Sequence, residues 1–169
     1  MRIFKEEQRF NQTWIIVLIA VSAIVPLFVI TREHLDNPES FSTFEFVGTL
    51  ALVIVASGFI FVFKLSTRID EEGIHYKFFP IQLKFKLLPW TEIKTANVRT
   101  YDAITEFGGW GLKGGALWSK SKGRAVNVSG DIGIQLQLKN GKKLLIGTQK
   151  KEEAIRVLEA YKTKLNTDV

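Results

Sequence analysis

The sequence contains no cysteine and only two histidines. Without cysteine, the chain can form no disulfide bond, thiolate nucleophile or cysteine-based zinc site. His34 and His75 have no second histidine or carboxylate at ligand spacing, so we predict no metal site. GxSxG, HExxH, Walker and protein-kinase motifs are also missing from the sequence. We therefore expect a protein that is not an enzyme and that has no cofactor.

Ionisable residues are missing from two apolar stretches in the first 63 residues. Residues 14–30 read WIIVLIAVSAIVPLFVI, and residues 46–63 read FVGTLALVIVASGFIFVF. A hydrocarbon core of about 30 Å needs roughly 20 helical residues at about 1.5 Å each, so both stretches are close to spanning length. They predict two transmembrane helices. Without charged groups, they offer no proton relay or ion pathway within the membrane.

Basic residues precede the first apolar stretch, which is also a feature of signal peptides. However, this stretch is longer than a typical signal core, and no small-residue cleavage site follows it. We therefore expect an uncleaved helix and assign residues 1–63 to an N-terminal segment and a two-helix transmembrane hairpin. The loop between the helices contains Arg32, whereas the outer flanks contain Arg2, Lys5, Arg9, Lys64 and Arg68. The positive-inside rule then predicts a multi-pass protein with both termini in the cytoplasm.

Residues 64–169 carry 19 Lys and Arg against 11 Asp and Glu, and their apolar residues mostly alternate with polar ones. This alternation predicts β-strands over residues 65–70, 74–78, 83–87, 96–101, 124–128, 132–138 and 143–146. Asn140-Gly141 is typical of a two-residue type I′ turn between the last two strands. Pro89 to Ile93 predicts a short helical turn with Thr91 as its cap.

After the last strand, the apolar period changes from 2 to 3.6 residues. Thr148 is the expected N-cap of an amphipathic helix, with Glu152 and Glu153 near its positive end. One face of this helix carries apolar residues, namely Ala154, Ile155, Leu158, Tyr161 and Leu165. A single amphipathic helix after about seven strands is expected to cover a sheet face or close the end of a barrel.

The order of these elements resembles a family of bacterial PH-like-domain membrane proteins of unknown function. The resemblance covers the chain from about residue 13. It is most specific at Pro89-Trp90-Thr91-Glu92-Ile93, Tyr101, Glu106-Phe107-Gly108-Gly109-Trp110-Gly111, Asn127-Val128-Ser129-Gly130 and Leu145-Ile146-Gly147-Thr148-Gln149-Lys150. It implies that residues 64–169 form a PH-like barrel of about seven antiparallel strands, in two orthogonal sheets closed by the C-terminal helix. It also implies a location in the bacterial plasma (inner) membrane, but no ligand and no site residue.

Two neighbouring segments are candidates for a binding site. Gly108–Gly115 is rich in glycine, which allows backbone N–H groups to approach an anion, but tight barrel corners and bulges need glycine too. The segment that follows is basic and aromatic. We expect headgroup or partner contacts from Trp110, Lys113, Trp118, Lys120, Lys122 and Arg124. A solvated hairpin loop is the alternative interpretation.

Three functions compete for this chain. The first is a membrane-anchored PH-like interaction module that docks protein partners at the cytoplasmic membrane face, with self-association as a further option. The second is the binding of anionic lipid headgroups through the basic loop. The third, an enzyme, lacks a nucleophile and a base. No nucleic-acid recognition motif is present, so we expect no nucleic acid as a partner.

Overall fold

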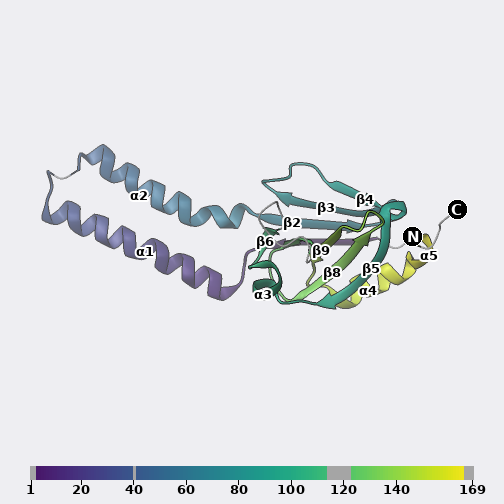
Figure 1. Cartoon of the computed structure of the whole chain (residues 1–169). Helices are drawn as coiled ribbons and strands as arrows, with labels where there is room; N and C mark the ends of the chain where they lie inside the picture. The colour runs from purple at the N-terminus through teal and green to yellow at the C-terminus, as the bar shows by residue number, and fades with distance from the viewer. Residues whose placement is uncertain (1–2, 40, 114–122, 166–169) are drawn as a thin grey trace. The chain divides into compact units, whose positions relative to one another are not determined.

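The computed structural model describes residues 3–39, 41–113 and 123–165. The chain divides into two compact units (Figure 1). One is a β domain built from Met1–Arg9 and Lys64–Val169, and the other is a helical hairpin, Phe10–Phe63. The hairpin is therefore an insertion within the β domain. The N-terminal segment that sequence analysis grouped with the hairpin in residues 1–63 contributes residues 4–9 to the β domain.

The hairpin contains helix α1 (Thr13–Asp36) and helix α2 (Thr43–Gly58), which continues into the 3-10 helix η1 (Phe59–Val62). Both helical stretches are long and apolar enough to cross a membrane. α2 begins three residues before the predicted apolar stretch because Ser42 and Glu45 form a reciprocal capping box.

The first sheet has four antiparallel strands in the order β1-β2-β3-β4. Their bounds are Phe4–Arg9, Lys64–Ile69, Gly73–Phe79 and Lys86–Pro89. β1 and β2 pair along their full length, with Phe4 opposite Ile69 and Arg9 opposite Lys64. The chain thus leaves for the hairpin from one strand and returns to its immediate neighbour.

β1 was not predicted because its buried face is mostly polar. Phe4, Glu6 and Gln8 alternate as the buried residues of this strand. The Glu6 carboxylate accepts hydrogen bonds from the Thr148 hydroxyl at 2.6 Å and from the Gln149 N–H at 2.7 Å. The Gln8 amide donates to the carbonyl of Gly147 at 2.8 Å. β1 is therefore held by polar contacts to the last residue of β9 and to the two residues that follow it.

The connection between β3 and β4 differs from the prediction. The strand expected over residues 83–87 begins only at Lys86, and the side chains of Leu83 and Phe85 are exposed. The following 3-10 turn η2 (Trp90–Glu92) agrees with the helical turn predicted there. No side chain caps this turn, so the predicted role of Thr91 is wrong. Trp90 instead fixes it, because its buried indole N–H donates to the Asp70 carbonyl at 2.9 Å.

The second sheet has five strands in the order β5-β8-β9-β7-β6. Their bounds are Ile93–Thr100 (β5), Gly111–Lys113 (β6), Arg124–Asn127 (β7), Ile132–Leu138 (β8) and Lys143–Gly147 (β9). β7 and β9 run parallel, whereas the other pairs are antiparallel. In Figure 1 these strands cross the direction of β2 and β3.

The domain is mainly β, as predicted, but the predicted closed barrel of about seven antiparallel strands is wrong. Nine strands form two separate sheets across the described residues, and one pair is parallel. The two sheets meet at Pro89 and η2, where β4 ends and β5 begins. Pro89 still pairs with Gly73, and the 3-10 turn η2 that follows redirects the chain from the first sheet into β5 of the second.

The loop between β8 and β9 is longer than the predicted two-residue turn. Gln137 pairs with Lys143, and the Leu138 N–H donates to the Lys142 carbonyl at 2.8 Å, which leaves three loop residues. Only Gly141 among them has a positive φ, of 80°. A type I′ turn needs a positive φ at both central residues, so this loop is instead a turn followed by a left-handed glycine.

Helix α4 (Lys151–Ala160), followed by the short helix α5 (Lys162–Leu165), contacts β5, β8 and β1. Ala154, Val157 and Leu158 form its buried face. Of the predicted apolar stripe, Ala154, Leu158 and Tyr161 are buried, whereas Ile155 and Leu165 are partly exposed. Thr148 does not cap it, because the N-cap is Lys150 and the Thr148 hydroxyl is bonded to Glu6. On the other face of the second sheet, the short helix α3 (Ala103–Phe107) covers a separate small core.

Candidate functional site

A groove of about 420 Å³ lies between β5 and the C-terminal helices. Ala96 and Val98 of β5 contribute its apolar side, opposite Ile155, Leu158 and Leu165 of α4 and α5. Lys94, Thr95, Asn97, Glu159 and Lys162 complete its lining. The groove therefore combines an apolar floor with a rim that carries both signs of charge.

The sequence explains why this groove is open. Ala96 pairs with Leu136 and Val98 pairs with Ile134, and both partners on β8 are fully buried. The small side chains at positions 96 and 98 stop short of the helix, so both stay partly exposed. The far end of α4 is fixed by Tyr161, whose ring stacks on Trp90 with ring centroids 5.3 Å apart.

β5 forms one edge of the second sheet. Over the described residues it pairs only with β8, so its opposite side offers backbone N–H and C=O groups along the groove. Eight residues make it the longest strand of the described chain. An exposed edge strand of this length is a template for a further strand, and it lies beside an apolar groove.

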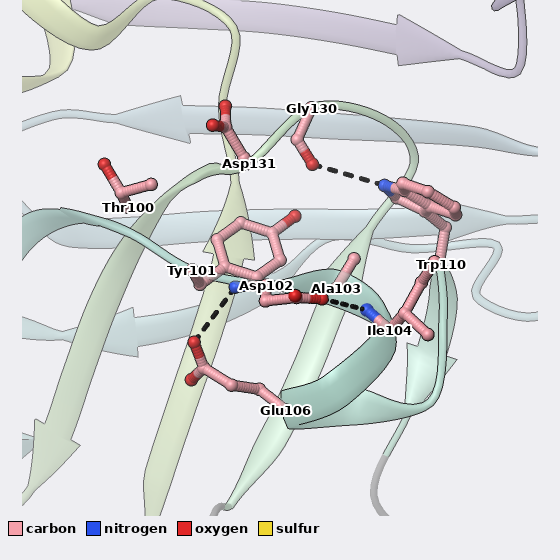
Figure 2. A pocket seen from close by; sticks show the side chains of 9 residues that line it. All are labelled: Thr100, Tyr101, Asp102, Ala103, Ile104, Glu106, Trp110, Gly130 and Asp131. Atoms are coloured by element: carbon pink, nitrogen blue, oxygen red, sulfur yellow. Dashed lines mark hydrogen bonds between the residues drawn. The ribbon is translucent and has the colours of Figure 1, made fainter.

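A second recess, of about 570 Å³, is wider and more open. It lies where α3 meets the turn between β7 and β8 (Figure 2). Its lining consists of Thr100, Tyr101, Asp102, Ala103, Ile104, Glu106, Trp110, Gly130 and Asp131. Three carboxylates therefore surround this recess, but two of them already have structural partners.

Asp102 is the N-cap of α3. Its carboxylate accepts hydrogen bonds from the N–H groups of Ile104 at 2.8 Å and Thr105 at 2.9 Å. These backbone donors, Thr105 first, hold the pKa of Asp102 below its ordinary value. Tyr101 beneath it is buried, which raises the pKa of its phenol, although the hydrogen bond from the Asn127 amide acts in the opposite direction.

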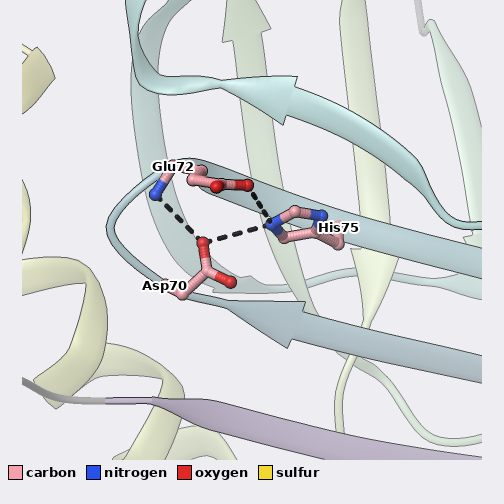
Figure 3. A group of neighbouring side chains, drawn as sticks. All are labelled: Asp70, Glu72 and His75. Atoms are coloured by element: carbon pink, nitrogen blue, oxygen red, sulfur yellow. Dashed lines mark hydrogen bonds and ion pairs between the residues drawn. The ribbon is translucent and has the colours of Figure 1, made fainter.

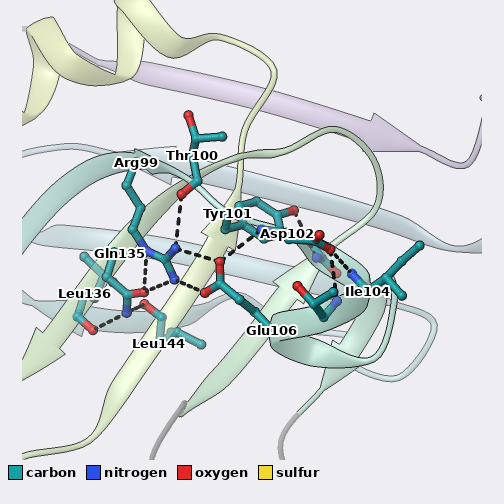
Figure 4. A network of polar contacts seen from close by, with 11 residues as sticks. Arg99, Thr100, Tyr101, Asp102, Ile104, Glu106, Gln135, Leu136 and Leu144 are labelled. Atoms are coloured by element: carbon teal, nitrogen blue, oxygen red, sulfur yellow. Dashed lines mark hydrogen bonds and ion pairs between the residues drawn. The ribbon is translucent and has the colours of Figure 1, made fainter.

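Glu106 belongs to a polar network on the outer face of the second sheet (Figure 4). Its two oxygens accept from the Arg99 guanidinium at 2.7 Å and 3.1 Å. The same guanidinium donates to the Gln135 side chain at 3.0 Å and 3.1 Å. Glu106 also accepts from the Asp102 N–H at 3.0 Å. The network ties α3 to β5 and β8, which is a structural role.

Asp70, Glu72 and His75 form a third cluster, at the turn between β2 and β3 (Figure 3). Their ligand atoms lie within 4.8 Å of one another, which is close enough for a metal ion, so the sequence-based statement that His75 has no carboxylate at ligand spacing is wrong. However, the Asp70 carboxylate already accepts from Arg68, from the Glu72 N–H at 3.0 Å and from His75 at 3.1 Å. The cluster therefore stabilises a turn, with an ion pair at its centre.

The residues predicted as contacts are only partly placed. Trp118, Lys120 and Lys122 lie outside the described residues. Lys113 ends β6 and Arg124 begins β7, so the two basic residues stand at the same end of this strand pair. Trp110 is partly buried against the small core under α3, and its indole N–H donates to the Gly130 carbonyl at 3.3 Å. That contact is structural.

The described part of Gly108–Gly115 forms a corner, which is the structural alternative for this segment. Gly108, with a φ of 71°, ends α3, and Gly109 and Gly111 also have positive φ values. Gly114 and Gly115 lie outside the described residues. The groove beside β5, in contrast, was not predicted. A sequence signal for it exists only in retrospect, in the small residues Ala96 and Val98 of an otherwise polar strand.

No protein-family model, curated protein or solved structure matches this chain. A functional assignment must therefore come from the chemistry of its own surfaces.

Proposed function

We propose that this chain is a membrane-anchored, non-catalytic interaction module with a PH-like β domain. Its groove between β5 and α4 binds an extended segment of a protein partner at the cytoplasmic membrane face. The observation that carries this proposal is the edge of β5 beside the apolar groove, which no other described strand covers. The two sheets and the C-terminal helix are compatible with the PH-like description.

Recognition in this groove follows from backbone chemistry. An added strand would form main-chain hydrogen bonds along β5, and its alternate side chains would point into the groove. Ala96, Val98 and Ile155 are partly exposed and would be covered by apolar side chains of the partner. Lys94, Glu159 and Lys162 at the rim would favour a partner with charged flanks.

The membrane anchor is supported by two helices of spanning length and composition. The pairing of β1 with β2 adds a constraint on topology. If both helices cross the bilayer, residues on the two sides of the hairpin must emerge on the same side for this sheet to form. Cleavage of the first helix as a signal peptide would also remove β1, which argues against that alternative. The excess of Lys and Arg in the outer flanks favours the cytoplasm.

A site-specific cross-link tests the proposed groove. A photo-reactive residue replaces Ile155 in the full-length protein, which is irradiated in membranes, and the cross-linked segments are mapped by mass spectrometry. We expect cross-links to one recurrent extended segment with alternating apolar residues, and at least a five-fold loss when Ala96→Arg blocks the groove. The same photo-reactive residue at Lys142, exposed in the β8–β9 loop, is the matched control.

Two results would contradict the proposal. One is an identical set of products from positions 155 and 142. The other is a product at position 155 that Ala96→Arg leaves unchanged, although the variant keeps the wild-type unfolding temperature. A cross-linked product made of two copies of this chain would mean that the groove binds a second copy of the chain instead of another protein.

A further inference from the structure

The connection between β3 and β4, together with the first residues of β4, exposes an unusual amount of apolar surface. Ile81, Leu83, Phe85 and Leu87 have exposed fractions of 59%, 73%, 47% and 41%. The other exposed large apolar residues of the described β domain, Ile3, Ile104 and Leu112, are far apart in the sequence. Single exposed apolar residues are normal, but a contiguous group of four indicates an interaction surface.

Basic residues are interleaved with this apolar group. Lys84 and Lys86 lie between its members and are exposed. Lys77 on β3 holds its ammonium 4.9 Å from the centroid of the Phe85 ring. The sequence from Gly73 to Thr91 contains no Asp or Glu, whereas the chain as a whole contains 17. The surface is therefore apolar and locally basic, the combination that suits an anionic bilayer interface.

Strand register places this connection at one particular end of the first sheet. Phe79, its last residue before Pro80, pairs with Lys64 on β2, and Lys64 pairs with Arg9 on β1. Neighbouring strands are about 4.8 Å apart, so these three residues form one row about 10 Å wide. Phe10 follows β1 directly and Phe63 directly precedes β2, and both residues belong to the hairpin. The apolar connection thus starts from the sheet end at which the chain enters and leaves the hairpin.

We propose that residues 81–87, which comprise the end of the β3–β4 connection and the first two residues of β4, rest in the headgroup region of an anionic bilayer. Ile81, Leu83 and Phe85 enter the interface, whereas Leu87 lies farther along the sheet, opposite His75. Lys77, Lys84 and Lys86 contact lipid phosphates. This contact would be a third point of membrane attachment and would limit rotation of the β domain about its two chain crossings. It would also leave the β5 edge free for a partner. The inference rests on the hairpin spanning the membrane.

The test uses the absence of cysteine from the chain. The full-length variant Leu83→Cys carries a polarity-sensitive fluorophore and is reconstituted at one copy per nanodisc of 70% neutral and 30% anionic phospholipid. Ile104→Cys is the matched control, because Ile104 is an equally apolar side chain with an exposed fraction of 64%. We expect a blue-shifted emission at position 83 and at least two-fold stronger quenching by lipids that carry a shallow quencher.

Charge reversal provides the second arm. Lys84→Glu with Lys86→Glu should lower the quenching at position 83 by at least half in anionic nanodiscs. In purely neutral nanodiscs the same pair should have little effect. Equal quenching at positions 83 and 104 overturns the proposal. So does quenching at position 83 that depends neither on lipid charge nor on the two glutamate substitutions. So does a blue shift that appears only when two copies share a nanodisc, since the surface would then contact a second copy.

Failure of the anchor is distinguishable from failure of this inference. A hairpin that does not span the membrane leaves the protein outside the nanodisc fraction on size exclusion. If the hairpin spans the membrane but residues 81–87 do not contact it, the protein elutes in the nanodisc fraction and the fluorophore at position 83 reports an aqueous environment.

Discussion

Asp70 shows how one buried carboxylate organises a turn of this domain. Burial opposes its ionisation, but hydrogen bonds from Arg68, the Glu72 N–H and His75 outweigh burial and lower the pKa of Asp70. Its side chain is only 4% exposed, whereas that of Arg68 is 48% exposed. The backbone carbonyl of Asp70 also accepts a hydrogen bond from the indole N–H of Trp90. The residue therefore connects the β2–β3 turn to the corner between the two sheets.

Asp70→Asn should destabilise the β domain by about 1.5–3 kcal/mol at pH 7, because a charge-assisted set of hydrogen bonds is lost. A carboxylate with a lowered folded-state pKa stabilises the fold above its unfolded pKa of about 3.9, and that contribution disappears as pH falls through the folded value. The wild type should therefore lose more stability than the variant as pH falls from about 5 to 2. Thermal unfolding of the full-length protein in detergent measures this difference. Parallel pH profiles would contradict it.

At the scale of secondary structure, sequence patterns identified the elements with a regular apolar pattern, either alternating, helical or continuous. β2, β3, β5, β7, β8 and β9, both long helices and the amphipathic helix α4 all appear near their predicted positions. β1 was not predicted because Glu6 and Gln8 occupy buried positions at which a strand usually carries apolar residues. In β4 the pattern was misleading, since Leu83 and Phe85 alternate correctly but remain exposed.

The binding site was less predictable than the fold. Basic and aromatic residues drew attention to the segment after Gly108, of which Trp110 proved to be a structural contact. The groove beside β5 depends on the distance between an edge strand and a helix more than fifty residues later in the chain. No local pattern encodes that distance, because it arises from the packing of β5, β8 and α4.

Buried and exposed residues alternate along β1, and this alternation gives a testable prediction. Phe4→Ala removes a side chain with no exposed surface and should cost about 3–5 kcal/mol of unfolding free energy. Lys5→Ala, one residue later on the solvent face, should cost less than about 0.5 kcal/mol. Chemical unfolding of both full-length variants in detergent measures the two costs. Equal small costs would mean that residues 4–9 do not belong to the sheet.

The whole molecule differs from a simple domain attached to a membrane anchor. Its hairpin is inserted between two strands that pair with each other, so both of its chain connections lead directly into one sheet. Only residues 10–12 separate β1 from α1, and only Phe63 separates η1 from β2. If the hairpin spans a membrane, movement of either helix would be transmitted through these short connections to β1 or β2. A fragment that begins at residue 64 would lack one strand of the sheet, so functional studies require the complete chain.

The most direct test of this architecture is a disulfide between β1 and β2 in the membrane-embedded protein. Glu7 and Ser66 pair across these strands, and cross-strand partners lie at a Cα separation compatible with a disulfide. With no native cysteine to interfere, Glu7→Cys with Ser66→Cys should cross-link nearly completely under mild oxidation in native membranes. The control pair Glu7→Cys with Thr67→Cys, which points to opposite faces of the sheet, should cross-link at least ten-fold less. Equal cross-linking of the two pairs, or none in either, would contradict a β domain completed by its N-terminal strand.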